Sequence, residues 1–167
     1  MINVLVFPCG SEIGLEVHNA LKYDKHINLV GLSSVSSHGR VVYKNYIEGI
    51  SFITSDTFME ELNKIIEDNN IDVLIPAYDD VILYLSEHRD ELKCKLATSN
   101  KTTCDIARSK RKTYEVLQGE WYIPETFKVS QITEKDLPLF AKPDIDGGLV
   151  GGASLKVDFG KIVNYNK

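Results

Sequence analysis

The stretch INVLVFPCGSEIGLEVHNALKYDKHINLVGL, residues 2–32, decides the fold. It opens with an apolar, β-rich run at 2–7 that ends in a Pro-Cys-Gly turn, as a buried strand does when it enters a tight turn. Apolar side chains then recur at helical spacing, and a second apolar run follows at 27–32. The core side of this helix is expected to be Ile13, Val17, Ala20 and Leu21. Strand, helix and strand at this spacing predict a βαβ unit with parallel strands.

The alternation of strand and helix periods continues to residue 98. Residues 33–49 are polar and aromatic without a clear period, which favours an irregular surface segment. Asp56 or Thr57 is expected to cap the next helix, with Glu60 in capping-box position after Thr57, and Asn69-Asn70 suits the end of this helix. The further strands that we expect are 51–54, 71–75 and 95–98. Residues 1–98 are therefore predicted to form a Rossmann-like α/β domain, a parallel sheet of four or five strands with helices on both faces.

Residues 99–167 follow a different pattern. Residues 99–118 are polar, basic and helical in tendency, and strand-like runs follow at 126–129 and 139–142. The segment 144–154 contains four glycines. This pattern predicts a second, α+β domain over 99–167, with a boundary near residue 98.

Composition and charge exclude several classes of protein. The 167 residues are 43% hydrophobic and 26% charged, with a net charge of −5, which is ordinary for a soluble protein and disfavours a nucleic-acid partner. The sequence has no apolar run long enough to span a membrane and no leader-like start, so we expect a cytoplasmic protein without a membrane partner. Three cysteines without Cys-x-x-Cys spacing and four scattered histidines predict neither a disulfide framework nor a metal site.

The turn Gly10-Ser11-Glu12-Ile13-Gly14 lies between a strand and a helix. Backbone amides at such a turn suit a phosphate or a carboxylate, because they lie at the positive end of the helix. Close packing of the helix on the strand explains the same glycines, and the sequence favours this simpler interpretation. A dinucleotide site is disfavoured, because it calls for G-x-G-x-x-G and for an acidic residue at the end of the second strand.

A second candidate is Asp79, which with Asp80 follows the apolar run ending Ile75-Pro76. The carboxyl ends of parallel strands are where open sheets bind ligands. The alternative is that Asp79 or Asp80 caps the helix that follows, and the sequence favours this simpler interpretation.

A third candidate combines a basic helix with a lysine and a glycine-rich segment. The helix carries Lys110, and Lys142 ends a predicted strand just before Pro143. Glycines let backbone amides approach phosphate closely, and lysine supplies positive charge. The segment is not a Walker loop, because the G-K-[ST] ending is absent. Its candidate phosphate-contacting residues are Gly147, Gly148, Gly151, Gly152 and Ser154.

The order of these pieces resembles the ATP-grasp superfamily. Its members open with a small pre-ATP-grasp α/β domain that has a glycine turn after the first strand and an Ile-Pro-x-x-Asp segment, here Ile75–Asp79. A helix with an Asp-Lys pair follows, here Ser109-Lys110, and then Ile-Pro-x-Thr, here 123–126. Lys142-Pro143 and the glycine segment complete the order. The chain is most similar to the carbamoyl-phosphate-synthase-like carboxylate–amine ligases.

This resemblance implies an enzyme that uses ATP and Mg²⁺ to convert a carboxylate into an acyl phosphate, which an amine then attacks. Lys110 and Lys142 would contact the nucleotide in one shared cavity, and the glycine segment would close over its phosphates. Gly10, Ser11, Glu12 and Asp79 would contact the small-molecule substrates. The magnesium ligands of the family come later than residue 167, so none is assigned to this chain.

Two features depart from the family pattern: Ser109 stands in place of the aspartate, and the spacing of the glycine segment differs from G-x-G-S. We expect the chain to be an N-terminal fragment that is inactive alone and completed by the missing ATP-grasp half, or paired in a homodimer. The alternative from a different class is a non-catalytic α/β ligand-binding or assembly module whose basic helix docks a partner.

Overall fold

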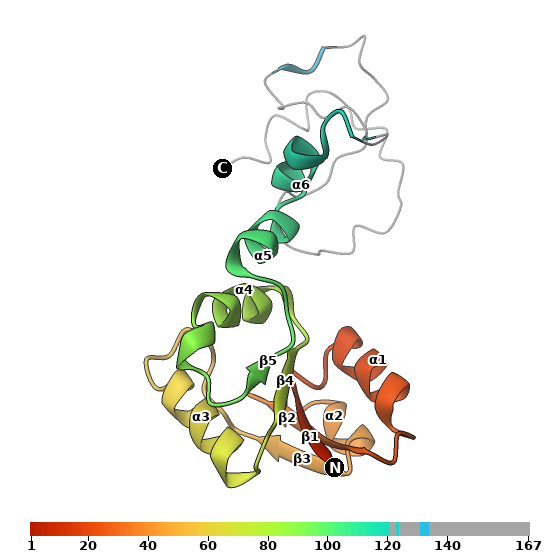
Figure 1. Ribbon diagram of the computed structural model, residues 1–167, viewed down its shortest axis with the longest axis vertical. Helices are drawn as coiled ribbons and strands as arrows, with labels where there is room; N and C mark the ends of the chain where they lie inside the picture. Colours follow the sequence, from red (N-terminus) through yellow and green to blue (C-terminus); the bar gives the residue numbers. More distant parts are fainter. Residues whose placement is uncertain (121–122, 124–130, 134–167) are drawn as a thin grey trace. The chain divides into compact units, whose positions relative to one another are not determined.

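The computed structural model describes residues 1–120, 123 and 131–133 (Figure 1). The chain divides into two compact units, Met1–Asp105 and Ile106–Lys167. The strands predicted at 126–129 and 139–142 and the glycine segment 144–154 lie outside the described residues.

The first unit is built on a five-stranded sheet in which every strand pair is parallel. The strand order is β3-β2-β1-β4-β5, so the first strand of the chain lies in the middle. Burial explains this position, because β1 is apolar on both faces while the outer strands are short and partly exposed. The strands are β1 Ile2–Phe7, β2 Ile27–Ser33, β3 Asn45–Glu48, β4 Val73–Pro76 and β5 Lys95–Leu96. The predicted parallel α/β fold is confirmed.

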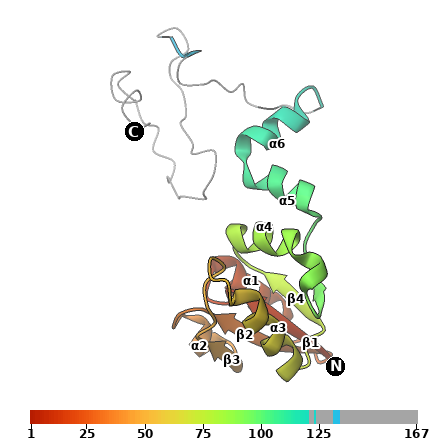
Figure 2. The same cartoon turned by 90° about the vertical axis from the view of Figure 1, so that its left-hand side faces the viewer.

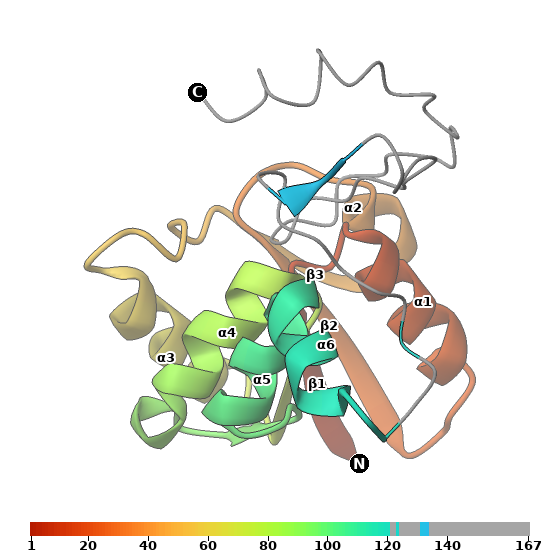
Figure 3. The same ribbon diagram turned by 90° about the horizontal axis from the view of Figure 1, so that it is seen from above.

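Helices cover both faces of this sheet, with α1 and α2 on one side and α3 and α4 on the other (Figures 2 and 3). Alternate residues of β1 separate the two layers: Val4 and Val6 pack under α1, and Leu5 and Phe7 pack under α3 and α4. The larger layer centres on the fully buried ring of Phe58. The helices are α1 Glu12–Leu21, α2 Gly39–Val42, α3 Phe58–Asp68 and α4 Asp79–Glu87.

Two predictions for residues 33–54 were wrong, and so was one for the core side of α1. The segment predicted to be irregular contains α2 and β3, whereas the strand predicted at 51–54 does not form. Among the described strands, Asn45–Glu48 pairs with β2 alone and is half-exposed, so it lacks the apolar pattern of a buried strand. In α1, Ile13 is 45% exposed and the buried residue is Gly14, because the helix approaches the sheet through its glycine.

The start of α3 is held by Glu61 rather than by the predicted capping box. Thr57 is the cap residue, but its side chain makes no capping hydrogen bond; its hydroxyl donates to Glu61 at 2.6 Å. The Glu61 carboxylate also accepts from the backbone amide and the hydroxyl of Ser51, each at 2.9 Å. At the other end, Asn70 adopts a positive φ of 49°, as its place after the helix predicts.

These contacts make the loop at Ser51–Thr57 sensitive to acid. The hydroxyl of Thr57 above all, and then the amide and hydroxyl of Ser51, lower the pKa of Glu61 below its ordinary value of 4.5. A carboxyl whose pKa is lowered by folding stabilises the fold above its unfolded pKa, and this contribution is lost as the pH falls through the folded pKa. We therefore expect an NMR titration midpoint for Glu61 below 4.5, which Thr57→Val moves upward. A midpoint at or above 4.5 in the unsubstituted chain would contradict the carboxylate's role in holding this loop.

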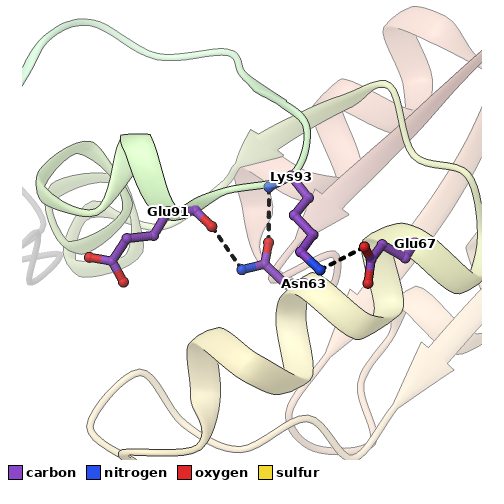
Figure 4. A network of polar contacts seen from close by, with 4 residues as sticks. All are labelled: Asn63, Glu67, Glu91 and Lys93. Carbon is purple, nitrogen blue, oxygen red and sulfur yellow. Dashed lines mark hydrogen bonds and ion pairs between the residues drawn. The ribbon is translucent and has the colours of Figure 1, made fainter.

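A polar network joins α3 to the segment before β5 (Figure 4). The side chain of Asn63 donates to the carbonyl of Glu91 at 2.8 Å and accepts from the backbone amide of Lys93 at 3.0 Å. The ammonium of Lys93 pairs with Glu67 at 2.6 Å, and both side chains are about half exposed. Asn63 thus fixes two backbone groups, while the ion pair at the surface contributes little.

The first unit continues past the predicted boundary into α5, Lys101–Arg108. Cys104 is buried and its thiol donates to the carbonyl of Ser99 at 3.4 Å. Lys101 pairs with Glu87 of α4 at 3.1 Å. The start of α5 is therefore anchored on the first unit. Helix α6, Lys110–Leu117, belongs to the second unit.

Candidate functional site

The candidate site lies at the carboxyl ends of the neighbouring strands β1 and β4. The chain leaves β1 through α1 toward β2, and leaves β4 through α4 toward β5, so the connections diverge between the two strands. This is the switch point at which open parallel sheets bind ligands. Phe7 and Pro76 are paired across these ends. The predicted turn beginning at Gly10 and the predicted Asp79 therefore follow adjacent strand ends.

Ser11 links these two segments directly. As the cap residue of α1, its hydroxyl accepts from the amide of Gly14 at 2.9 Å. The same oxygen lies 2.8 Å from the carbonyl of Ala77 and 2.9 Å from that of Pro8, either of which can take its proton. Ser11 thus ties the turn after β1 to the turn after β4, a structural role that the sequence did not reveal. Its predicted contact with a substrate stays a prediction.

Both glycines of the turn are needed for close packing. A Cβ added at Gly14 would lie 2.7 Å from the carbonyl oxygen of Cys9 and 2.8 Å from that of Pro8. A Cβ at Gly10 would lie 2.4 Å from the Cβ and Oγ of Ser37. For Gly14, close approach of the helix to the end of the strand thus has direct geometric support, whereas Gly10 packs against the loop residue Ser37. The ligand contact of Gly10 stays a prediction.

Beneath the turn, Cys9 and Tyr43 form a buried layer. Burial raises the pKa of the Cys9 thiol to about 11, although the neighbouring Ser37 hydroxyl works in the opposite direction. Burial, and then the nearby Cys9, raise the pKa of Tyr43, whose hydroxyl donates to the carbonyl of Gly14 at 2.5 Å. Both groups keep their protons at neutral pH. We therefore assign Cys9 to packing rather than to nucleophilic catalysis.

The exposed part of the site is acidic and aromatic. Glu12 and Asp79 are exposed and lie in the first turns of α1 and α4, where the helix dipole favours a carboxylate. The prediction that Asp79 or Asp80 caps α4 was wrong, because Tyr78 occupies the cap position and the two acids follow it inside the helix. The side chain of Tyr78 is 53% exposed. The structure thus brings Gly10, Ser11, Glu12 and Asp79 to one edge of the sheet.

Lys110 is the first residue of α6, directly after the break that follows α5. Ser109 causes that break: its backbone is extended and its hydroxyl accepts from the amide of Lys112 at 3.1 Å. Serine and aspartate are comparable cap residues, so Ser109, which stands where the family pattern has an aspartate, can cap this helix as an aspartate would. Lys142, Gly147, Gly148, Gly151, Gly152 and Ser154 lie outside the described residues. A cavity shared by Lys110 and Lys142 therefore stays a prediction.

Two further observations concern the described residues alone. The described residues contain no cluster of three or more His, Cys, Asp or Glu side chains able to hold a metal ion. No helix among them combines the length and the apolar character that crossing a membrane requires.

Comparison with solved structures supports the fold. The chain matches glycinamide-RNase-transformylase T from Mycobacterium tuberculosis with a TM-score of 0.53 and 13% identity, over 73% of this chain and 36% of that one. N5-carboxyaminoimidazole ribonucleotide synthetase from Thermotoga maritima matches with a TM-score of 0.44 and 17% identity, over 70% and 29% of the two chains. At such identity the first match shows a shared fold, and the chain spans about a third of that structure.

Comparison of sequences points to a different protein for the C-terminal part. The family model for triosephosphate isomerase matches residues 130–166. Over 30 residues the chain is 73% identical to triosephosphate isomerase of Acetivibrio thermocellus. This matched stretch covers 17% of this chain and 12% of that protein. The match is too short to place the whole chain in that family.

This second match bears on the glycine segment, because 130–166 includes Lys142 and every glycine assigned to phosphate binding. The same residues stand at the end of the motif order by which the chain resembles the ATP-grasp superfamily. Spacing and residue type alone did not reveal this second likeness. Only the full string of residues, compared with known sequences, could have revealed the second one.

Proposed function

We propose that the described part of the chain is the substrate-binding α/β domain, with the first helices of the ATP-binding module, of an ATP-dependent carboxylate–amine ligase of the ATP-grasp type. The observation that carries the proposal is that the turn at Gly10–Glu12 and Asp79 follow the neighbouring ends of β1 and β4 at the switch point, where Ser11 bonds to Ala77. The shared fold with a transformylase structure supports it. The order of the sequence motifs, from this turn to Ser109-Lys110, adds further support.

At this edge of the sheet, different groups would bind the two substrates. Amides at the start of α1 would attract the carboxylate or phosphate of one substrate, since a helix N-terminus favours an anion. The carboxylates of Glu12 and Asp79 would attract the amine of the other, because both are exposed to solvent. ATP, with Mg²⁺, would supply the phosphoryl group that activates the carboxylate. The described residues would bind and orient the substrates and hold no metal.

Lys110 is the residue of this part proposed to meet the nucleotide. Its place in the first turn of α6, fixed by the Ser109 cap, gives its side chain a defined origin. Lys142 and the glycine segment are the proposed partners from the rest of the chain. A lysine ammonium near phosphate oxygens is the ordinary means of stabilising transferring phosphate.

The match to triosephosphate isomerase favours a second candidate for residues 130–166. The name of that enzyme says that it acts on a triose phosphate. In this alternative the glycine segment would bind the phosphate of a small phosphorylated compound, independently of α6. Phosphate is common to both candidates, so the test must separate a nucleotide from a triose phosphate.

Calorimetry on the 167-residue chain with ATP plus Mg²⁺, and separately with a triose phosphate, makes this separation. If the ligase proposal holds, ATP binds and both Lys110→Ala and Lys142→Ala weaken it by about ten- to a hundredfold, the loss of one charged phosphate contact. If the second candidate holds, the triose phosphate binds, and Lys142→Ala weakens it while Lys110→Ala does not.

Lys44→Ala serves as the matched control, since it removes a lysine of the first unit that neither candidate uses. It should leave either affinity within about twofold. Equal affinity for ATP in the unsubstituted chain and in both lysine variants, with the fold intact, would sink the nucleotide assignment. A folded chain that binds neither compound would leave the non-catalytic assembly module as the better description.

A further inference from the structure

Arg89 holds three backbone carbonyls with one side chain. It opens the 3₁₀ turn η1, Arg89–Glu91, directly after α4, and is half-buried. One guanidinium nitrogen donates to the carbonyl of Leu96 at 3.0 Å. The other donates to the carbonyls of Thr98 and Ser99, each at 2.8 Å. These distances are those of good hydrogen bonds, and the charge on the donor strengthens them.

The segment held in this way is the connection from β5 to α5. Its last bond to the sheet runs from the amide of Ala97 to the carbonyl of Leu74 at 2.9 Å. Helix α5 then begins, with the side chain of Asn100 accepting from the amide of Thr103 at 2.9 Å. Between these two points the carbonyls of Thr98 and Ser99 both face Arg89. The connection is therefore anchored to the end of α4.

Arginine is suited to this place by its shape. Its planar guanidinium presents five donors in a fixed arrangement, whereas a lysine ammonium is a single point of charge on a flexible stem. Within the part of the chain that the structure describes, Arg89 takes part in no ion pair. Among these described residues its charge is thus directed at the connection rather than at a carboxylate.

We propose that Arg89 is a latch that fixes the connection 97–100, and with it the start of α5, to the first unit. The chain passes from the first unit to the second within α5. Opening the latch frees the connection while the parallel sheet stays folded. This inference concerns the first unit alone and does not depend on the proposed ligase activity.

Hydrogen exchange measured by mass spectrometry on the full chain tests the latch. Arg89→Ala is expected to speed exchange of the Ala97, Thr103 and Cys104 amides at least about tenfold, since these bonds lie on either side of the freed segment. Exchange in β1 and β4 is expected to stay within about twofold. Arg89→Lys, which can satisfy only part of the arrangement, should fall between the unsubstituted chain and Arg89→Ala.

Lys93→Ala is the matched control, because it removes a nearby charged side chain that forms a half-exposed ion pair with Glu67. It should leave exchange at Ala97, Thr103 and Cys104 unchanged. Exchange at these three amides within twofold of the unsubstituted chain in Arg89→Ala would overturn the latch. So would an equal rise in β1 and β4, because Arg89 would then be a general stabiliser. Should Arg89→Ala fail to fold, Arg89→Lys decides alone: unchanged exchange at the three amides overturns the proposal.

Discussion

Phe58→Ala is expected to lower the free energy of unfolding by about 3–5 kcal/mol, the usual cost of deleting a buried aromatic side chain. Phe58 begins α3 and has no solvent exposure. Its ring lies 5.7 Å from that of Phe7 in β1 and 5.6 Å from that of Tyr84 in α4, measured between centroids. The substitution thus empties the point at which the sheet meets both helices of this layer. Urea denaturation followed by circular dichroism measures the loss.

Phe52→Ala is the matched control, because it removes the same side chain where it is 62% exposed. Its effect should stay within about 0.5 kcal/mol, as for most surface substitutions. A loss below about 1.5 kcal/mol for Phe58→Ala, with an unchanged dependence on urea, would mean that the core around α3 collapses to fill the space. The layer arrangement deduced from Leu5 and Phe7 would then need revision.

The elements that the sequence predicted well are those with an unambiguous period. The run at 2–7 is apolar on both faces and became the central strand, and the break at residue 8 sets its end. The strand Asn45–Glu48 escaped prediction, because its pairing with β2 depends on a neighbour brought near by the fold. Periodicity reports burial, and an edge strand of four residues has too little of it to be seen.

Local chemistry was harder to predict than the elements themselves. Thr57 is the cap residue of α3, one of the two that the sequence offered, but Glu61 and not Glu60 bonds to the loop at Ser51. Which acid takes part depends on where the preceding loop lies, and loop position is a tertiary property. Similarly, the exposure of Ile13 follows from the close approach at Gly14, which a helical wheel cannot show.

The candidate site was predictable in its placement and not in its contacts. Two segments nearly seventy positions apart were expected at carboxyl strand ends, and parallel pairing of β1 with β4 makes those ends neighbours. The bond from the Ser11 hydroxyl to Ala77 could not be foreseen, since it depends on the register of the two strands. Lys142 and the glycines beyond it carry two sequence likenesses, and only ligand binding will separate them.

Gly14→Ala is expected to destabilise the chain by about 3 kcal/mol, the upper part of the range for overpacking. On an exposed helix the same change would stabilise by up to about 1 kcal/mol, because alanine is the better helix former. The sign therefore decides whether Gly14 serves close packing. The carbonyl oxygens of Pro8 and Cys9, at 2.8 and 2.7 Å from the added Cβ, belong to the backbone and cannot rotate away as a side chain would.

Urea denaturation of Gly14→Ala beside Glu16→Ala provides the measurement. Glu16 is exposed in the same helix, so its replacement should change stability by no more than about 0.5 kcal/mol. A neutral or stabilising effect of Gly14→Ala would show that α1 can move away from the turn, and the packing role would be wrong. A strong loss of stability would show instead that the turn is rigid. Any ligand at this edge would then meet amides already held in place by Ser11 and by the hydroxyl of Tyr43 on the Gly14 carbonyl.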